Sequence, residues 1–164
     1  MRIEGSCHCG AVQFAVEAPH PVPFNLCYCS ICRKTAGAGG FAINLGAKAE
    51  TLEVTGRDHV RTYQSSAHME RTFCGTCGSA LWGYSPKWPD LLHPHASAID
   101  TDLPVPPERV HLFVGSRANW VEPCIGADDK EFEAYPQESL AEENQQGGIL
   151  YPGSSLYVAV NALL

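Results

Sequence analysis

The sequence predicts a mostly β fold in a single domain, and three observations support this. Short runs of alternating apolar residues recur along the chain, Gly and Pro separate them, and helix-forming stretches are scarce. The length of 164 residues fits one domain and is too short for two full-sized ones. Hydrophobic residues make up 45% of the chain and charged residues 18%, which excludes an intrinsically disordered protein.

The expected strands share a period-two pattern, which places every second side chain on the same face of a sheet. In residues 11–17 this face carries Val12, Phe14 and Val16, and the prolines that follow His20 end the strand. Residues 69–73 and 79–84 are expected to pair as a hairpin whose tip is residues 74–78. The other expected strands are residues 40–45, 59–64, 95–99 and 110–114.

Non-strand segments are fewer. Residues 30–36 are expected to form one or two helical turns, with Ser30 as a candidate cap and Gly37 at the end. Residues 105–109 are rich in proline and predict a loop. We expect one domain over residues 1–123 and a C-terminal extension of unclear structure over residues 124–164. Within it, residues 137–146 are polar, and the apolar residues 156–164 suit a strand, a short helix or a partner-contacting tail.

Charge and targeting signals narrow the class of protein. Lys and Arg number 11 and Asp and Glu 18, so the formal net charge is −7. This charge disfavours binding to nucleic acid and to anionic membranes, both of which attract basic surfaces. The N-terminus lacks the apolar run of a signal peptide, and no stretch reaches the length of a membrane span. We therefore expect a cytoplasmic protein whose eight cysteines are metal ligands or catalytic thiols rather than disulfides.

Seven of the eight cysteines fall into three groups, and Cys124 stands alone as an expected free thiol. The groups are a C-x-C at Cys7 and Cys9, a C-x-C-x-x-C at Cys27, Cys29 and Cys32, and a C-x-x-C at Cys74 and Cys77. Such spacings suit Zn²⁺, which thiolates bind tetrahedrally.

The three groups divide most simply into two metal sites. Cys7, Cys9, Cys74 and Cys77 would complete a closed, structural Cys₄ site, whereas the other three thiolates would leave a fourth position free, as in catalytic zinc sites. Other assignments stay open at this point. The second and third groups could share an ion, both zinc ions could be structural, the cysteines could form disulfides, or the C-x-x-C could be a redox motif.

Three segments in this order resemble the glutathione-dependent formaldehyde-activating enzyme family, also called the CENP-V/GFA domain family. They are Gly-Ser-Cys-His-Cys-Gly-Ala-Val at 5–12, Cys-x-Cys-x-x-Cys-Arg-Lys-x-x-Gly-Ala at 27–38 and Thr-Phe-Cys-Gly-Thr-Cys-Gly-Ser-Ala-Leu at 72–81. Residues 110–120 are also similar to the closing strand and Trp segment of the family. The resemblance spans roughly residues 3–123 and implies an Mss4-like fold of small antiparallel sheets.

The resemblance also implies two zinc ions and a reaction. A structural zinc is expected on Cys7, Cys9, Cys74 and Cys77, and a catalytic-type zinc on Cys27, Cys29 and Cys32. The implied activity is that of a carbon–sulfur lyase similar to S-(hydroxymethyl)glutathione synthase, which joins a thiol such as glutathione to formaldehyde or a small aldehyde.

The substrate side of the site is less defined by the sequence. Arg33 and Lys34 follow the third cysteine of the trio directly, and their charges would attract anionic glutathione. One of the seven histidines could fill the fourth zinc position, but the sequence does not choose among them. The alternative function is a non-catalytic, zinc-stabilised module that binds a thiol metabolite or a protein partner. The sequence gives no oligomeric state.

Overall fold

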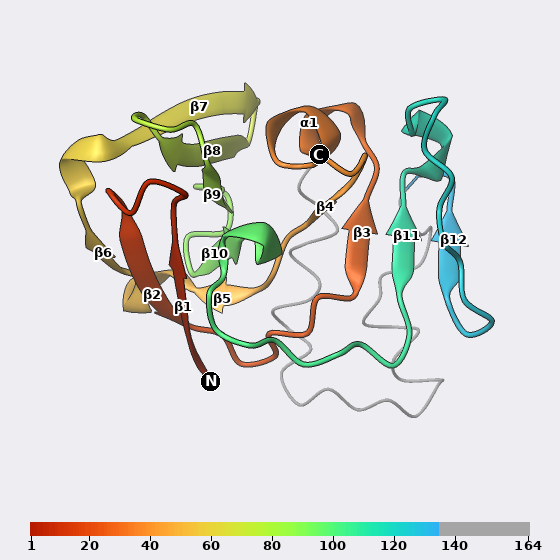
Figure 1. Cartoon of the computed structure of the whole chain (residues 1–164), viewed down its shortest axis with the longest axis horizontal. Coiled ribbons are helices and arrows are strands. Elements are labelled where there is room, and N and C mark those ends of the chain that lie inside the picture. Colours follow the sequence, from red (N-terminus) through yellow and green to blue (C-terminus); the bar gives the residue numbers. More distant parts are fainter. Residues whose placement is uncertain (135–164) are drawn as a thin grey trace.

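Three small β-sheets make up most of the computed structural model, which describes residues 1–134 (Figure 1). This confirms the prediction of a mostly β protein with few helices. The segments 137–146 and 156–164, discussed from the sequence, lie outside the described residues. In the described part, no helix is long and apolar enough to cross a membrane.

The first sheet is antiparallel and contains the N-terminal strand. Its order is β1 (Arg2–Ser6), β2 (Gln13–Glu17) and β6 (Glu53–Thr55). In the β1–β2 pair, Ile3 lies opposite Val16, and both side chains are buried. The sequence predicted β2 but not β1, in which Ile3 is the only large apolar residue.

The second sheet is antiparallel and includes the predicted hairpin. β8 (Met69–Cys74) pairs with β9 (Ala80–Tyr84), and residues 75–79 connect them. Its buried face packs on the first sheet, where Phe14 of β2 meets Trp82 of β9 edge to face at 5.1 Å between ring centroids. In sheet order the strands are β5 (Ala47–Lys48), β10 (Leu91–Pro94), β9 (Ala80–Tyr84), β8 (Met69–Cys74) and β7 (Val60–Ser66).

The third sheet is mixed, a feature that the expectation of small antiparallel sheets did not include. β11 (Val110–Leu112) runs parallel to both β3 (Asn25–Cys27) and β12 (Lys130–Phe132). β4 (Ala42–Ile43) pairs antiparallel with β3 on the other side. β12 belongs to the segment that we assigned to a C-terminal extension, and the domain boundary at residue 123 stays a prediction.

A buried chain of hydrogen bonds links this sheet to the cysteine-rich segment. The Tyr28 hydroxyl lies 2.9 Å from His111 Nδ1, and His111 Nε2 lies 3.4 Å from Asp129 Oδ2. Tyr28 is 1% exposed and His111 is fully buried. The chain therefore fixes the backbone between Cys27 and Cys29 against β11 and the Asp129 turn.

The helical elements are short. α1 (Ser30–Thr35) confirms the predicted turns, but its cap is Cys29, whose Sγ accepts a hydrogen bond from the Cys32 amide, and not Ser30. The strand predicted over 95–99 is wrong, because a 3₁₀ turn occupies its centre. The predicted strand over 110–114 ends at Leu112, where another turn follows. The 3₁₀ turns are η1 (Ala49–Thr51), η2 (Arg57–His59), η3 (Ala96–Ala98) and η4 (Val114–Ser116).

Candidate metal centres

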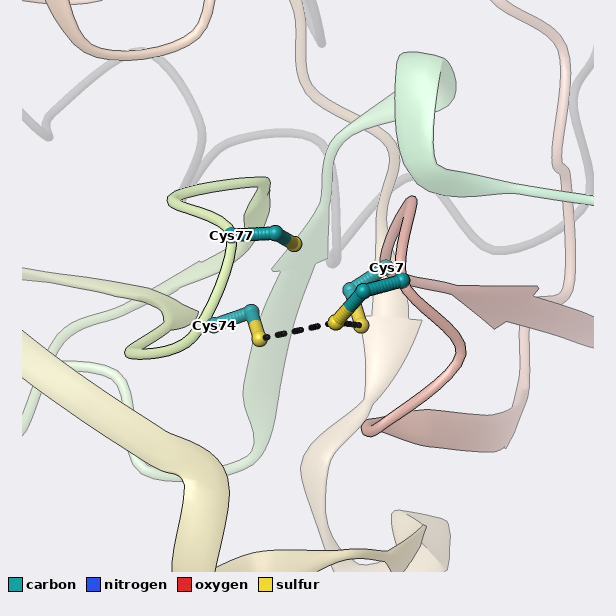
Figure 2. Close-up of side chains that lie close together, drawn as sticks. Cys7, Cys74 and Cys77 are labelled. Atoms are coloured by element: carbon teal, nitrogen blue, oxygen red, sulfur yellow. Dashed lines mark hydrogen bonds between the residues drawn. The ribbon is translucent and has the colours of Figure 1, made fainter.

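Four cysteines from two distant turns meet at one point. The sulfur atoms of Cys7, Cys9, Cys74 and Cys77 all lie within 4.8 Å of one another. Figure 2 shows the labelled side chains of Cys7, Cys74 and Cys77 turned toward a common centre. The Sγ–Sγ distance is 3.5 Å between Cys7 and Cys9 and 3.9 Å between Cys9 and Cys74. Four thiolates at about 2.3 Å from a tetrahedral zinc ion would be about 3.8 Å apart, so the spacing fits such an ion.

The backbone of both turns holds these thiols in place. In the first turn, the Cys7 amide donates to the Val12 carbonyl, and the Val12 amide donates to Cys7 Sγ at 3.2 Å. In the second, the Gly78 amide donates to the Cys74 carbonyl at 2.8 Å, and Gly78 has a φ of 78°, which favours glycine. Each turn is therefore stabilised by hydrogen bonds within itself.

Hydrogen bonds also favour a thiolate in this cluster. The hydroxyl and the backbone amide of Ser79 lower the pKa of Cys77 to about 5. The Ser79 Oγ lies 3.2 Å from Cys77 Sγ. A thiolate is the form of cysteine that binds metal, so Ser79 prepares Cys77 as a ligand. The sequence analysis did not identify Ser79.

The second cluster is local and more deeply buried. Cys27 ends β3, Cys29 caps α1 and Cys32 lies within α1, and their sulfur atoms lie within 4.8 Å of one another. The three residues are 6%, 6% and 2% exposed. Among residues 1–134, this group contains no fourth His, Cys, Asp or Glu ligand. The arrangement therefore offers three thiol donors and leaves one tetrahedral position without a protein ligand from the described part of the chain.

Two nitrogen donors single out Cys32 within the trio. Arg71 Nη2 lies 3.6 Å and Asn44 Nδ2 lies 3.8 Å from Cys32 Sγ. Hydrogen bonds from Cys27 and Cys29, together with Arg71 and Asn44, lower the pKa of Cys32. The same contacts with the two other cysteines raise the pKa of Cys27. Of the three thiols, Cys32 is therefore the one whose thiolate form the neighbouring nitrogen donors favour.

The cation next to the trio is thus Arg71, which the sequence analysis missed. Arg71 lies in β8 and is 6% exposed, far along the chain from the motif that it contacts. Arg33 and Lys34, the predicted cations, occupy the last turn of α1, where Arg33 is half-buried and Lys34 is exposed. Their role toward a substrate stays a prediction.

Phe113 covers another side of the trio in an unusual backbone conformation. Its side chain packs against the apolar cluster around Cys27, Cys29 and Cys32. Among the described non-glycine residues it alone has a positive φ, 61°. A bulky residue adopts this conformation only where the surrounding structure enforces it, and such strain is concentrated at functional sites.

The donor chemistry of both clusters fits zinc. Thiolates select zinc, copper(I) and iron–sulfur clusters over magnesium and calcium, and tetrahedral thiolate sites are typical of zinc. The first cluster has the donors of a closed structural site and the second those of an open one. Cys124 is exposed and belongs to neither group.

Comparison with known proteins identifies the family to which this chain is similar. The profile of the glutathione-dependent formaldehyde-activating enzyme family matches residues 2–116. A protein of Halomonas elongata, which its name assigns provisionally to the glutathione-dependent formaldehyde-activating enzymes, is 55% identical over 154 residues. That alignment covers 91% of this chain and 98% of the relative.

More distant relatives share parts of the chain. An uncharacterised lyase of Schizosaccharomyces pombe is 30% identical over 79 residues, which cover 48% of this chain and 55% of the lyase. A crystal structure of a Rhodobacter sphaeroides protein is similar with a TM-score of 0.52 and 29% identity, over 62% of this chain and 91% of that one. Because the family profile spans most of the chain and both cysteine clusters, this protein belongs to the glutathione-dependent formaldehyde-activating enzyme family.

Proposed function

We propose that this protein is a zinc-dependent carbon–sulfur lyase that adds glutathione, or a related thiol, reversibly to formaldehyde or another small aldehyde. In the forward direction, a sulfur electron pair forms the C–S bond and the carbonyl π pair moves to oxygen. That oxygen then takes the proton that the thiol released, so the product is a hydroxymethyl thioether. No oxidant or reductant is needed.

The unequal donor count of the two clusters carries this proposal. Four sulfur atoms in the first cluster satisfy a tetrahedral ion completely, whereas three in the second leave a position for an exchangeable ligand. Zinc held there would favour the thiolate form of a substrate thiol and polarise a carbonyl oxygen. We therefore assign Cys27, Cys29 and Cys32 to the catalytic centre and the other four cysteines to the structural site.

The surrounding residues supply charge and enclosure. Arg71 and Asn44 donate to Cys32 Sγ and favour its thiolate form, and Phe113 packs against the trio as an apolar wall. Arg33 and Lys34 lie in the last turn of α1, the helix that carries Cys32, and their positive charge would suit the carboxylates of glutathione. Holding thiol and aldehyde together supplies rate by removing the entropy cost of their encounter. A thiol substrate of this kind implies a reducing, cytoplasmic setting.

The test is the rate of thiol exchange at equilibrium. Exchange spectroscopy by NMR on a mixture of glutathione and formaldehyde measures interconversion of glutathione with its hydroxymethyl adduct, with and without protein. We expect the zinc-loaded protein to accelerate exchange above the spontaneous rate, and Cys29→Ser to abolish the acceleration. Cys124→Ser, which removes an exposed cysteine outside both clusters, is the matched control and should behave like the parent.

The spontaneous reaction makes this comparison necessary. Thiols add to formaldehyde readily in water, so binding alone does not demonstrate catalysis. If calorimetry detects glutathione binding but exchange is not faster, the protein is a zinc-stabilised module that binds a thiol and not an enzyme. Absence of both would direct the search to other thiols and aldehydes.

A further inference from the structure

We propose that His93 and His95, together with Asn44, form a buried site that binds the oxygen of the small aldehyde, or of its hydrate, beside the cysteine trio. The proposal rests on the proposed function and adds a second substrate site to it. We call Asn44, Arg71, His93 and His95 the histidine cluster. Neither histidine belongs to a metal group within the described residues.

The sheet register places the members of the histidine cluster on one face. Arg71 of β8 and His93 of β10 both lie opposite Gly83 of β9, the strand between them. Residues directly opposite in antiparallel strands share a face, so Arg71 and His93 point to the same side. A Cβ at Gly83 would lie 3.1 Å from Met69 Sδ and 3.6 Å from Arg71 Nη1, so the glycine makes room for these two side chains on this face.

His95 and Asn44 continue the same face toward the trio. His95 follows His93 by two residues in extended backbone, with φ of −76° and ψ of 127°, so it points to the same side. It forms an isolated antiparallel bridge with Asn44. Asn44 and Arg71 both donate to Cys32 Sγ, which shows that this face is turned toward the trio.

This face contains five buried polar atoms with no hydrogen-bond partner in the described structure. They are both ring nitrogens of His93, both ring nitrogens of His95, and Asn44 Oδ1. The two histidines are 2% and 1% exposed. Buried polar groups are almost always paired, so five orphaned atoms on one face indicate a polar ligand or ordered water.

The available atoms define the chemistry of that ligand. Burial, with a smaller contribution from Arg71, lowers the pKa of His93 to about 4 and that of His95 to about 3, so both rings are neutral near pH 7. The Leu45 backbone raises the pKa of His93 in part, although the contact does not meet the geometry of a hydrogen bond. Each neutral ring offers one N–H donor and one acceptor, and Asn44 Oδ1 accepts.

A small carbonyl compound fits these donors and acceptors. An imidazole N–H can donate to the aldehyde oxygen, and the hydroxyls of the hydrate can also donate to the ring acceptor and to Asn44 Oδ1. Arg71 disfavours a cationic ligand, and the burial of both histidines excludes a molecule as large as glutathione. The thiol and the aldehyde would therefore approach the trio from different sides.

The first test separates the two substrates kinetically. We expect His95→Leu to raise the KM for formaldehyde about tenfold, the factor for one lost hydrogen bond, while the dissociation constant for glutathione stays within about twofold. His95→Gln, which keeps a donor and an acceptor, should recover part of the loss. His68→Leu, which changes an exposed histidine, is the control. A changed glutathione affinity with an unchanged KM for formaldehyde would overturn the proposal.

The second test does not depend on catalysis. Two-bond ¹H–¹⁵N spectra of the zinc-loaded ¹⁵N-labelled protein report the protonation and hydrogen bonding of each ring nitrogen, and His95→Gln assigns the His95 signals by their loss. We expect formamide, an unreactive one-carbon carbonyl compound, to shift the His95 signals saturably. Such a shift in a protein without exchange activity would support this site and refute the proposed function. If the signals do not move, the cluster holds water only and the proposal is wrong, even if His95→Leu fails to fold.

Discussion

Replacing one cysteine in each cluster should lower stability by different amounts, because the two clusters close loops of different length. The contact between Cys9 and Cys74 joins residues 65 positions apart, whereas Cys27 and Cys32 are five apart. The loop-closure relation for a cross-link gives about 4 kcal/mol for the long loop and about 2 kcal/mol for the short one. Loss of the metal cross-link through Cys74→Ser should therefore cost about twice as much as its loss through Cys29→Ser.

Thermal unfolding measures this difference. For a protein of this size, 1 kcal/mol corresponds to roughly 2–4 °C in Tm, so the cross-link terms predict a loss of roughly 8–16 °C for Cys74→Ser and roughly 4–8 °C for Cys29→Ser. Cys124→Ser should unfold like the parent protein, since its side chain is exposed and outside both clusters. Melts by circular dichroism at equal zinc concentration provide the comparison. Equal losses, or a larger loss for Cys29→Ser, would refute the assignment of the structural role to the first cluster.

Three further outcomes follow from the same contacts. Elemental analysis of protein purified under reducing conditions should find close to two zinc ions per chain, and one or none in a folded sample would exclude two sites. Glutathione binding measured by calorimetry should weaken as salt rises, and weaken further in Arg33→Ala/Lys34→Ala, whereas salt-independent binding would exclude a charge-based contact. Tyr28→Phe should lower the free energy of unfolding by about 1–3 kcal/mol, because it leaves buried His111 Nδ1 without its 2.9 Å partner, and an unchanged denaturation midpoint would show that this hydrogen bond adds nothing.

The sequence identified the three cysteine groups because the members of each group are close along the chain. C-x-C and C-x-x-C spacings fix which sulfur atoms meet within a turn, whatever the rest of the fold does. The cysteine count made Cys7, Cys9, Cys74 and Cys77 the simplest four-ligand set, and the family resemblance implied the same set. The structure brings these four together. The hairpin from Met69 to Tyr84 was predictable for the same local reason.

Residues that act across strands were not predictable in this way. Arg71 is a charged residue in a strand, where such a residue normally faces solvent, but it lies on the same face as buried Met69 and is 6% exposed. The pair His93 and His95 carried a usable signal, since two histidines two residues apart in an apolar segment share one strand face. The strand expected over 95–99 failed because the chain turns at Ala96–Ala98 after bridging Asn44.

The two clusters therefore differ in what a distant mutation can do to them. The first cluster lies between two turns, and hydrogen bonds within each turn hold its cysteines. Its geometry therefore depends on the ion and on few other contacts. The three cysteines of the trio are close along the chain, but their surroundings come from two sheets. Cys27 ends a strand of the third sheet, and Arg71 reaches Cys32 from a strand of the second. Figure 1 shows α1 between these two groups of strands. A change that shifts one sheet against the other would leave three thiols in place and still misplace the nitrogen donors at Cys32, so activity should be lost well before the metal is.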